Sequence, residues 1–201
     1  MIAVDVETTG LDPRTASIVS LGAVDLDDPT NQFYEECRIW DGAHVSEESL
    51  AITDTTREQI GEGSGRQAEA DLIRSFIAWA MDRPESHTFV GQNPRFDSGF
   101  VEEACLRAGI AFPFAHRSLD THTLCWIHLT QQGLPTPTAN KRSAINLDYI
   151  LDYCGLPPEP RPHNALQGAL SHAEVFFRLV YNKRVLPEFI EHPIPWQTKI
   201  A

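Results

Sequence analysis

The sequence predicts an α/β domain built on a mixed sheet, and two observations carry this prediction. Short β-branched segments separated by turn residues open the chain, which is typical of an antiparallel meander. Beyond them, short apolar segments alternate with stretches whose apolar residues recur every three to four positions, which indicates strands alternating with helices. The chain has 201 residues, the size of one domain, and contains no internal repeat. We therefore expect one mixed sheet flanked by helices.

Five strands are expected. Residues 2–6 and 17–25 are β-branched runs on either side of a Gly/Asp/Pro turn, which predicts a hairpin, and residues 32–39 supply a third strand. Residues 87–91 and 116–119 are short segments between helical stretches, and they complete a five-stranded sheet.

Helices are expected wherever apolar residues recur at 3.6-residue spacing, as Leu72, Phe76 and Ala80 do. A short helix is expected at 46–50, and a second at 55–60 because Thr55 and Glu58 have the spacing of a capping box. The longer helices are expected at 67–82, 95–108, 121–132, 146–153 and 164–181.

Two segments lack a regular pattern. Residues 133–143 are rich in Pro and Thr and locally basic, so we expect an exposed loop. Residues 184–201 contain three prolines and no convincing helix. We expect a domain of residues 1–183 and a C-terminal tail, 184–201, packed on this domain or on a partner.

The composition is that of an ordinary globular domain. No apolar run approaches the ~20 residues of a membrane span, and the N-terminus shows no signal pattern, so we expect a cytoplasmic protein with no membrane contact. The four cysteines are widely spaced, which predicts reduced, buried thiols. Lys and Arg number 16 against 28 Asp and Glu, a net charge of −12. Because nucleic-acid-binding surfaces are usually basic, charge alone favours a small-molecule enzyme.

The first candidate site lies on the first strand. Asp5 and Glu7 are two residues apart, so both side chains point to the same face. Neighbouring carboxylates repel each other, and one pKa rises unless a cation lies between them. The alternative is the solvent-facing side of an edge strand. We favour a metal site, because carboxylate oxygens suit magnesium or manganese.

Two further polar residues lie at the ends of expected elements. Asp97 is one turn into the helix that follows Gly91–Pro94, facing back toward the strand ends. A lone aspartate there is more often a cap or a solvated charge. His163 separates a Pro-rich loop from the last helix, where a lone histidine is usually structural. Neither residue indicates a function alone.

Taken in order, these segments resemble the motifs of the DEDDh-type 3′–5′ exonucleases. This group belongs to the ribonuclease H-like superfamily and includes proofreading exonucleases and ribonuclease T. The most specific match is Asp5-Val6-Glu7-Thr8-Thr9-Gly10, and the second is Asn93-Pro94-Arg95-Phe96-Asp97. Leu119-Asp120-Thr121 and Asn146-Leu147 match more weakly. The resemblance spans residues 2–181 and implies a ribonuclease H-like fold.

The resemblance also implies an activity. It is the metal-dependent hydrolysis of phosphodiester bonds at the 3′ end of single-stranded DNA, RNA or short oligonucleotides. Asp5, Glu7 and Asp97 match the residues that hold two divalent metal ions, Mg²⁺ or Mn²⁺, and His163 matches the general base.

Substrate contacts follow from the same resemblance. The backbone and side chains around Thr8, Thr9 and Leu11 would cradle the 3′-terminal nucleotide. Leu11 or Phe96 would lie against its base, and the alternative for either residue is a place in the core. Relatives such as ribonuclease T form homodimers, so a homodimer is one expected arrangement.

The sequence departs from the family pattern at Gly168. The family carries a fourth acid five residues after the histidine, where this chain has a glycine. Three explanations stay open. His172, one turn further along the same helix face, replaces the ligand; water fills the gap; or catalysis is lost and the fold only binds nucleic acid or nucleotides. A hydrolase for small phosphodiesters is a further alternative, and the acidic composition favours a short substrate in any case.

Overall fold

A mixed sheet forms the centre of the computed structural model, which describes residues 1–82 and 87–197. In this part of the chain the sheet has six strands in the order β4-β3-β2-β1-β5-β6. Neighbours among β1, β2 and β3 are antiparallel, whereas β5, β6 and β4 join in parallel. The strands are β1 (Ile2–Thr8), β2 (Ile18–Asp25), β3 (Gln32–Arg38), β4 (Gln67–Ala68), β5 (Phe89–Gly91) and β6 (Leu119–Asp120).

The predicted α/β fold is confirmed, with one strand more than expected. The extra strand, β4, consists of two residues that the sequence pattern assigns to the start of a helix. It forms because this segment pairs with the end of β3, a contact between distant residues that helical periodicity does not encode.

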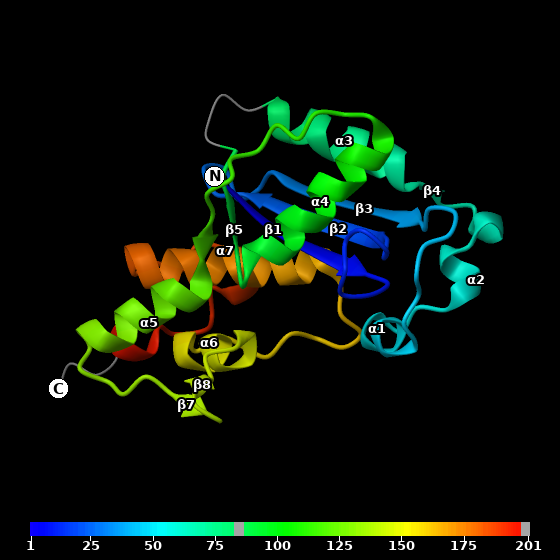
Figure 1. The fold of residues 1–201 in the computed structure, drawn as a ribbon. Coiled ribbons are helices and arrows are strands. Elements are labelled where there is room, and N and C mark those ends of the chain that lie inside the picture. The colour runs from blue at the N-terminus through cyan, green and yellow to red at the C-terminus, as the bar shows by residue number, and fades with distance from the viewer. Residues whose placement is uncertain (83–86, 198–201) are drawn as a thin grey trace.

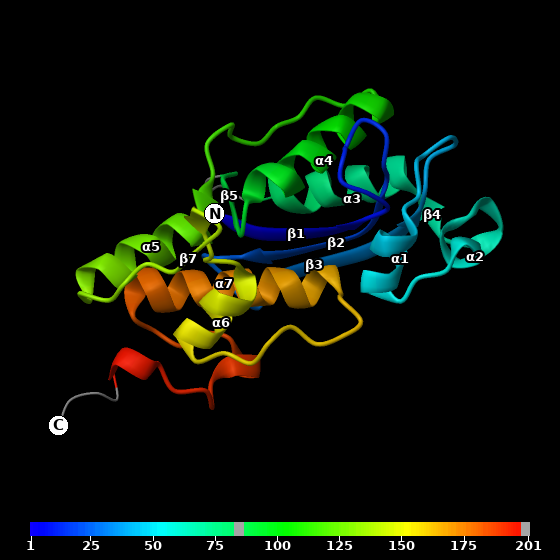
Figure 2. The same cartoon turned by 60° about the horizontal axis from the view of Figure 1, so that its bottom comes forward.

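Helices cover both faces of the sheet (Figures 1 and 2). Helices α3 and α4 lie on one face, and α7 lies on the other, next to α6. The helices are α1 (Glu47–Thr53), α2 (Arg57–Ile60), α3 (Glu69–Met81), α4 (Pro94–Ala108), α5 (Thr121–Gln131), α6 (Leu147–Cys154) and α7 (Ala165–Tyr181). None of the helices in the described residues is both long and apolar enough to cross a membrane.

Local details differ from the sequence prediction in several places. Of the predicted strand 116–119, only Leu119 lies in a strand, β6, because this segment pairs with β5 only at Leu119 and Asp120. The capping box of α2 is formed by Thr56 and Gln59, one residue later than predicted, because Gln59 reaches back to the Thr56 backbone. The predicted loop 133–143 contains a small hairpin, β7 (Thr138–Ala139) and β8 (Arg142–Ser143). Its four residues are exposed, so the hairpin adds nothing to the core.

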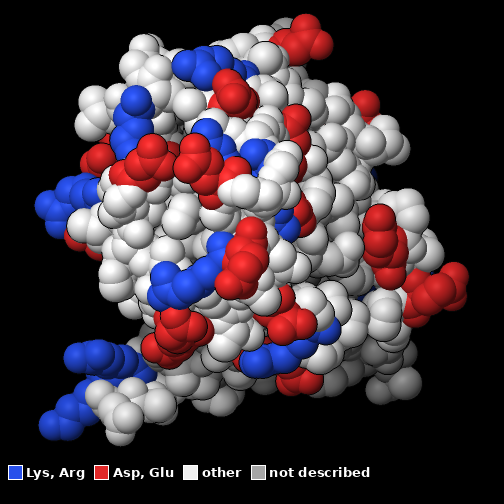
Figure 3. Space-filling model, turned by 90° about the vertical axis from the view of Figure 1, so that its right-hand side faces the viewer, with Lys and Arg blue, Asp and Glu red and all other residues white. Residues whose placement is uncertain are grey.

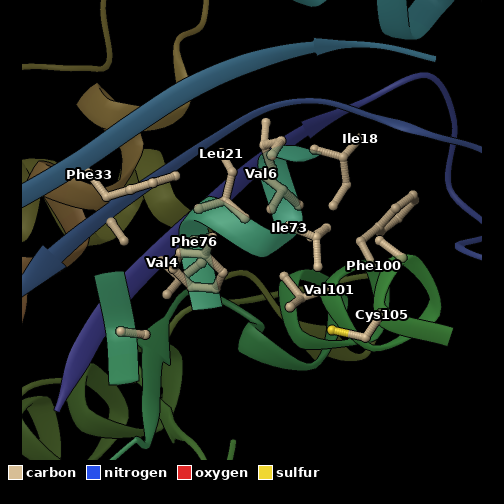
Figure 4. Close-up of a cluster of buried hydrophobic side chains, with 14 of the residues drawn as sticks. Val4, Val6, Ile18, Leu21, Phe33, Ile73, Phe76, Phe100, Val101 and Cys105 are labelled. Atoms are coloured by element: carbon tan, nitrogen blue, oxygen red, sulfur yellow. The ribbon is translucent and has the colours of Figure 1, made fainter. Parts of the chain in front are cut away.

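Side chains of β1 alternate between the two faces, and this alternation places the site. Ile2, Val4 and Val6 point into the core under α3 and α4, and Figure 4 shows Val4 and Val6 in this cluster. Ala3 belongs to the core on the α7 face. Asp5 has the parity of Ala3 and therefore lies on the α7 face.

Helix α7 lies very close to the sheet at its N-terminal end. A Cβ on Gly22, which pairs with Asp5 across β1 and β2, would overlap the backbone of Ala165 and Leu166. The lack of a side chain at Gly22 therefore allows the first turn of α7 to lie against β2, next to the strand β1 that carries Asp5 and Glu7.

A buried ion pair ties the C-terminal segment to α7. Arg178 and Glu174 are both 0% exposed, and Arg178 Nε donates to Glu174 Oε1 at 2.8 Å. Arg178 also donates to the carbonyls of Cys154, Phe189 and His192, at 2.8, 3.0 and 2.9 Å. The expected tail, 184–201, thus has contacts with α7, apart from its last four residues, which lie outside the described part.

Candidate active site

The site forms where β1 continues past the end of its neighbour. Only Ile2 and Ala3 pair with β5, which ends at Gly91, so the rest of β1 has no strand on that side. Two side chains satisfy the backbone groups left over. The Val6 N–H donates to Asp97 Oδ1 at 3.1 Å, and the Val4 carbonyl accepts from His172 Nδ1 at 3.3 Å. This end of β1 is therefore bordered by side chains instead of a strand.

Asp97 reaches β1 from the first turn of α4. Asn93 adopts a left-handed conformation with φ of 52°, and Pro94 occupies the start of the helix, where its missing N–H is no loss. The Asn93 N–H donates to Asp120 Oδ1 at 3.3 Å, which anchors this turn to the end of β6. Asp97 is 3% exposed, so it is not a solvated charge. Its carboxylate caps a strand N–H next to the predicted metal site.

Gly168 faces Asp5 directly. A Cβ built on Gly168 would lie 2.6 Å from Asp5 Cγ and 3.2 Å from Asp5 Cβ, and would overlap Oδ2. Real Cβ atoms do not approach other atoms so closely, so the Asp5 carboxylate takes the space that a side chain at 168 needs. The observed conformation of Asp5 therefore requires a residue without a side chain at position 168, where the family carries an acid.

His163 and Glu7 border the same small cavity. The cavity has a volume of about 210 Å³ and is also lined by Tyr34 and Asn164. The loop carrying His163 is fixed at its end, because the His163 N–H donates to the Ile52 carbonyl at 3.2 Å. Asn164 caps α7 and donates to Tyr34 Oη at 2.9 Å. The predicted base and one predicted metal ligand are therefore brought to one place.

The carboxylates carry strongly raised pKa values. Burial raises the pKa of Asp5 well above its usual range, and the charges of Asp97, Glu7 and Glu159 raise it further. Burial and then the charge of Glu159 raise the pKa of Glu7 to about 7. Burial raises the pKa of Asp97 to about 7, against the lowering effect of its backbone hydrogen bonds. No cationic side chain is among the groups that shift these three pKa values. The negative charge of the cluster is therefore not offset by a neighbouring Lys, Arg or His in these shifts.

The donor chemistry of this cluster fits hard divalent cations. Asp5, Glu7 and Asp97 offer carboxylate oxygens, the ligands that Mg²⁺ and Mn²⁺ prefer. The absence of a side chain at Gly168 leaves room for the Asp5 carboxylate against α7. Within residues 1–82 and 87–197, no three His, Cys, Asp or Glu side chains are grouped closely enough to hold a metal ion as they stand.

The predicted substrate-binding residues differ in their surroundings. Leu11 is 84% exposed and borders a cavity of about 610 Å³, which is also lined by His44 and Ile52. Phe96 packs on the core with its ring 4.9 Å from that of Phe100, and it is only partly buried. Thr8 is half-buried, and its hydroxyl donates to the Gly10 carbonyl at 2.8 Å.

The side chain of Thr9 is not exposed like that of Leu11. Its side chain is 0% exposed, its hydroxyl donates to the His44 carbonyl at 2.6 Å, and the same oxygen accepts from the Ser17 N–H at 2.9 Å. Because the buried Thr9 hydroxyl both donates and accepts a hydrogen bond, it fixes the turn that follows β1. The Thr9 side chain is therefore not available to touch a nucleotide.

His172, the suggested replacement ligand, is buried and hydrogen-bonded to the backbone of β1. It is 2% exposed, and its Nδ1 must carry the proton because the Val4 carbonyl can only accept. Its Nε2 has no partner among the described residues. Burial lowers the pKa of His172 to about 4, so the ring is neutral. Ligation by His172 stays a prediction.

Sequence reasoning overlooked Glu159. This residue lies in the Pro-rich loop before His163, and it is one of the charges that raise the pKa values of Asp5 and Glu7. The available signal was an acidic residue four positions before the predicted base, between two prolines.

Acidic and basic side chains are interspersed on the face shown in Figure 3, with no continuous basic surface on that face. This pattern agrees with the net charge of −12 and does not favour broad contact with a phosphate backbone.

Comparisons with known proteins place these features in a family. A model of the exonuclease family RNase_T matches residues 2–176. The PolC-type DNA polymerase III of Thermotoga petrophila is 27% identical over 181 residues, covering 89% of this chain and 12% of the polymerase. That of Pediococcus pentosaceus is 29% identical over 148 residues, covering 72% and 10%. This chain thus spans about an eighth or less of the length of these relatives.

Solved structures share the fold at low sequence identity. Cell-death related nuclease 4 (CRN-4) superposes with a TM-score of 0.71 at 15% identity, covering 91% of this chain and 64% of that one. The nuclease domain of 3′hExo, a DEDDh family member bound to rAMP, gives 0.68 at 16%, covering 91% and 92%. E. coli exonuclease I in complex with a dA16 oligonucleotide gives 0.70 at 15%, covering 94% and 42%.

The family match covers the segments that carry Asp5, Glu7, Asp97 and His163, and the fold matches that of a DEDDh family member. The resemblance inferred from these motifs is confirmed at the level of family and fold. The chain belongs to the RNase_T exonuclease family.

Proposed function

We propose that the protein is a metal-dependent 3′–5′ exonuclease. It hydrolyses phosphodiester bonds at the 3′ end of single-stranded DNA, RNA or short oligonucleotides. The observation that carries this proposal is the meeting of Asp5, Glu7 and Asp97 at the free end of β1, with His163 bordering the same cavity as Glu7. Family membership supports the reaction class.

The three carboxylates would hold two divalent ions, Mg²⁺ or Mn²⁺. Such ions supply activation of water and stabilisation of the charge that develops on the leaving 3′ oxygen. Asp5 and Glu7 approach from β1 and Asp97 from α4, so binding cross-links two elements. The Val6 N–H holds Asp97 in place for this role.

His163 acts as the general base. A ring nitrogen of its imidazole accepts the proton of the attacking water. The hydrogen bond from the His163 N–H to the Ile52 carbonyl holds its backbone in place beside Glu7.

The substrate we infer is a short or locally bound single strand. The cavity bordered by Leu11, His44 and Ile52 offers room for one terminal nucleotide. The interspersed surface charges and the net charge of −12 favour contact at one 3′ end over tracking of a long backbone. E. coli exonuclease I, solved with oligonucleotides, shows the fold in such a complex. A cytoplasmic location and a homodimer belong to the same proposal.

A second candidate function is a module that binds nucleic acid or nucleotides without cleaving them. Gly168 favours it, because the acid that the family carries at this position is missing. Hydrolysis of small phosphodiesters is a third candidate, suggested by the acidic composition.

The test follows a 5′-labelled single strand with Mg²⁺ or Mn²⁺ and compares the wild type with D5N and with D152N, an exposed control on α6. We expect products shortened from the 3′ end for wild type and D152N, and none for D5N. Binding without hydrolysis in either metal would establish the second candidate. Faster cleavage of a dinucleotide than of a longer strand would establish the third.

A further inference from the structure

A row of hydrogen-bonded side chains runs from β3 to the residue that follows His163. Arg66 pairs with Glu36 Oε2 at 2.5 Å, and Tyr34 Oη donates to Glu36 Oε1 at 2.7 Å. The same hydroxyl accepts from Asn164 Nδ2 at 2.9 Å. The row therefore connects the predicted general base to the sheet through Asn164, its neighbour in sequence.

Tyr34 lies where it can reach the start of α7. It pairs with Gly22 across β2 and β3, and directly paired residues of two strands point to the same face of the sheet. That face is the one covered by α7, because a Cβ on Gly22 would overlap the backbone of Ala165. Tyr34 also lines the cavity of about 210 Å³ that Glu7 and His163 border.

The Tyr34 hydroxyl keeps its proton at neutral pH. Burial, together with the hydrogen bond and the charge of Glu36, raises the pKa of Tyr34 to about 12. The hydroxyl therefore donates to Glu36 and accepts from Asn164 at the same time. Since Arg66 holds the other oxygen of Glu36, both ends of this carboxylate are fixed.

Asn164 uses both ends of its amide group. Its Oδ1 accepts from the N–H groups of Leu166 and Gln167, at 3.0 and 3.4 Å, and so caps α7. Its Nδ2 donates to Tyr34. Because the oxygen is bound to the helix and the nitrogen to β3, the amide has one orientation, and the backbone of Asn164 is fixed with it.

The imidazole of His163 depends on this backbone. Its ring makes no hydrogen bond or ion pair with the residues that the structure describes, so no side chain among them orients it directly. The His163 N–H donates to the Ile52 carbonyl at 3.2 Å, and the next residue in the chain is Asn164. These two anchors set where the ring lies relative to Glu7 in the shared cavity.

We propose that Tyr34 is a positioning residue for the general base, and that it acts through Asn164 on His163. This inference rests on the proposed function. Loss of the Tyr34 hydroxyl leaves the three carboxylates of the metal site in place, because none of them is among its hydrogen-bond partners. Its effect therefore falls on the removal of a proton from water and not on metal binding.

The test compares the wild-type full chain with Y34F, which removes only the hydroxyl, and with N164S. Serine caps a helix about as well as asparagine does, but its side chain is too short to bond Tyr34. Y181F, which removes an exposed hydroxyl at the end of α7, is the control. With a labelled single strand and Mn²⁺, we expect kcat to fall about 10- to 100-fold in Y34F and N164S. KM and Mn²⁺ affinity should stay within a few-fold, and Y181F should match the wild type.

A double-mutant cycle shows whether the effect passes through His163. In the H163A background Y34F should cause no further loss, because the base that it orients is absent. Equal losses in the wild type and in H163A would overturn the proposal. A Y34F protein as fast as the wild type would also overturn it, and a slow H163A protein in the same experiment would leave the proposed function intact.

Amide hydrogen exchange tests the anchor without any reaction. In the metal-free protein we expect the His163 N–H to exchange about 2- to 10-fold faster in Y34F, since a hydrogen bond of its neighbour is lost. Amides of α3, on the other face of the sheet, should exchange at unchanged rates, which a general loss of stability would not allow. Unchanged exchange at His163 would overturn the anchoring. A wild-type protein that cleaves no strand with Mg²⁺ or Mn²⁺ would overturn both the proposed function and this role of Tyr34.

Discussion

The carboxyl group of Asp5 fills the space that a side chain on residue 168 would occupy, with Asp5 Cγ 2.6 Å from the Cβ position. The two residues are therefore coupled: the conformation of Asp5 on β1 requires the absence of a side chain on α7. A departure that indicates loss of function in the sequence is, in the structure, part of how Asp5 is accommodated.

Substituting Gly168 with alanine tests this coupling. Alanine in a helix interior normally gains about 1 kcal/mol over glycine. Here we expect a net loss of about 1–3 kcal/mol, because overpacking against Asp5 outweighs the gain. Denaturant unfolding of G168A measures it. The control is G63A, where a Cβ meets nothing within 4 Å. A stabilised G168A would contradict the coupling.

Restoring the family's acid should not improve the enzyme. In G168D the new side chain competes with Asp5 for the same space, so Asp5 must leave its position. We expect weaker Mn²⁺ binding and slower hydrolysis than in the wild type, measured by titration and by cleavage of a labelled strand. Higher activity in G168D would show that Asp5 can give way to an acid at position 168 and that the wild-type site lacks one.

Removing the imidazole of His163 should slow hydrolysis without removing the metal. We expect kcat to fall by about 10²–10⁴-fold in H163A, the usual contribution of a general base, while Mn²⁺ affinity stays within a few-fold. H116A, at an exposed histidine outside the site, serves as the control. Equal rates for H163A and the wild type would exclude the assigned role.

His172 should make the folded protein less stable in acid. Its pKa is about 4 in the folded chain against 6.5 for the free group. Between these values the unfolded chain binds a proton at His172 and the folded chain does not, so the free energy of unfolding falls as pH is lowered. From about pH 7.5 to about pH 5 we expect a loss of about 2 kcal/mol.

The comparison for His172 is H172Q, which can still donate to the Val4 carbonyl but does not titrate. The carboxylates with raised pKa values act in the opposite direction, since their folded forms bind protons more tightly and gain stability in acid. They are shared by both proteins and cancel in the difference. An identical pH dependence for wild type and H172Q would refute the assignment.

Cutting the contacts of Arg178 tests the attachment of the C-terminal segment. In R178M the buried Glu174 keeps its bonds from the N–H groups of Val185 and Leu186, at 3.1 and 3.0 Å, but loses its cation. We expect a loss of about 3–5 kcal/mol, typical of an uncompensated buried charge. K183M, at an exposed lysine, should change unfolding little. A division into residues 1–183 and a tail stays a proposal, and a stable R178M would favour it.

Local sequence patterns were enough to predict most of the helices and strands and part of the candidate site. The two-residue period of β1 puts Asp5 and Glu7 on one face, and the 3.6-residue period of the apolar stripe defines α7. Motif order along the chain also associates Asp97 and His163 with them, and in the structure Asp97 binds the β1 backbone while His163 borders the same cavity as Glu7.

Only the tertiary structure decided how these residues meet. Asp97 binds the Val6 N–H across 91 positions of sequence, because β5 is too short to pair with that part of β1. Thr9 belongs to a motif but is buried, and Glu159 belongs to no motif but acts on Asp5 and Glu7. Periodicity and motif spacing record which way a side chain points along its own element. They do not predict which residue from a distant part of the sequence packs against that side chain. At Gly168 the packing partner is the Asp5 carboxyl group, and this contact explains why the position holds a glycine.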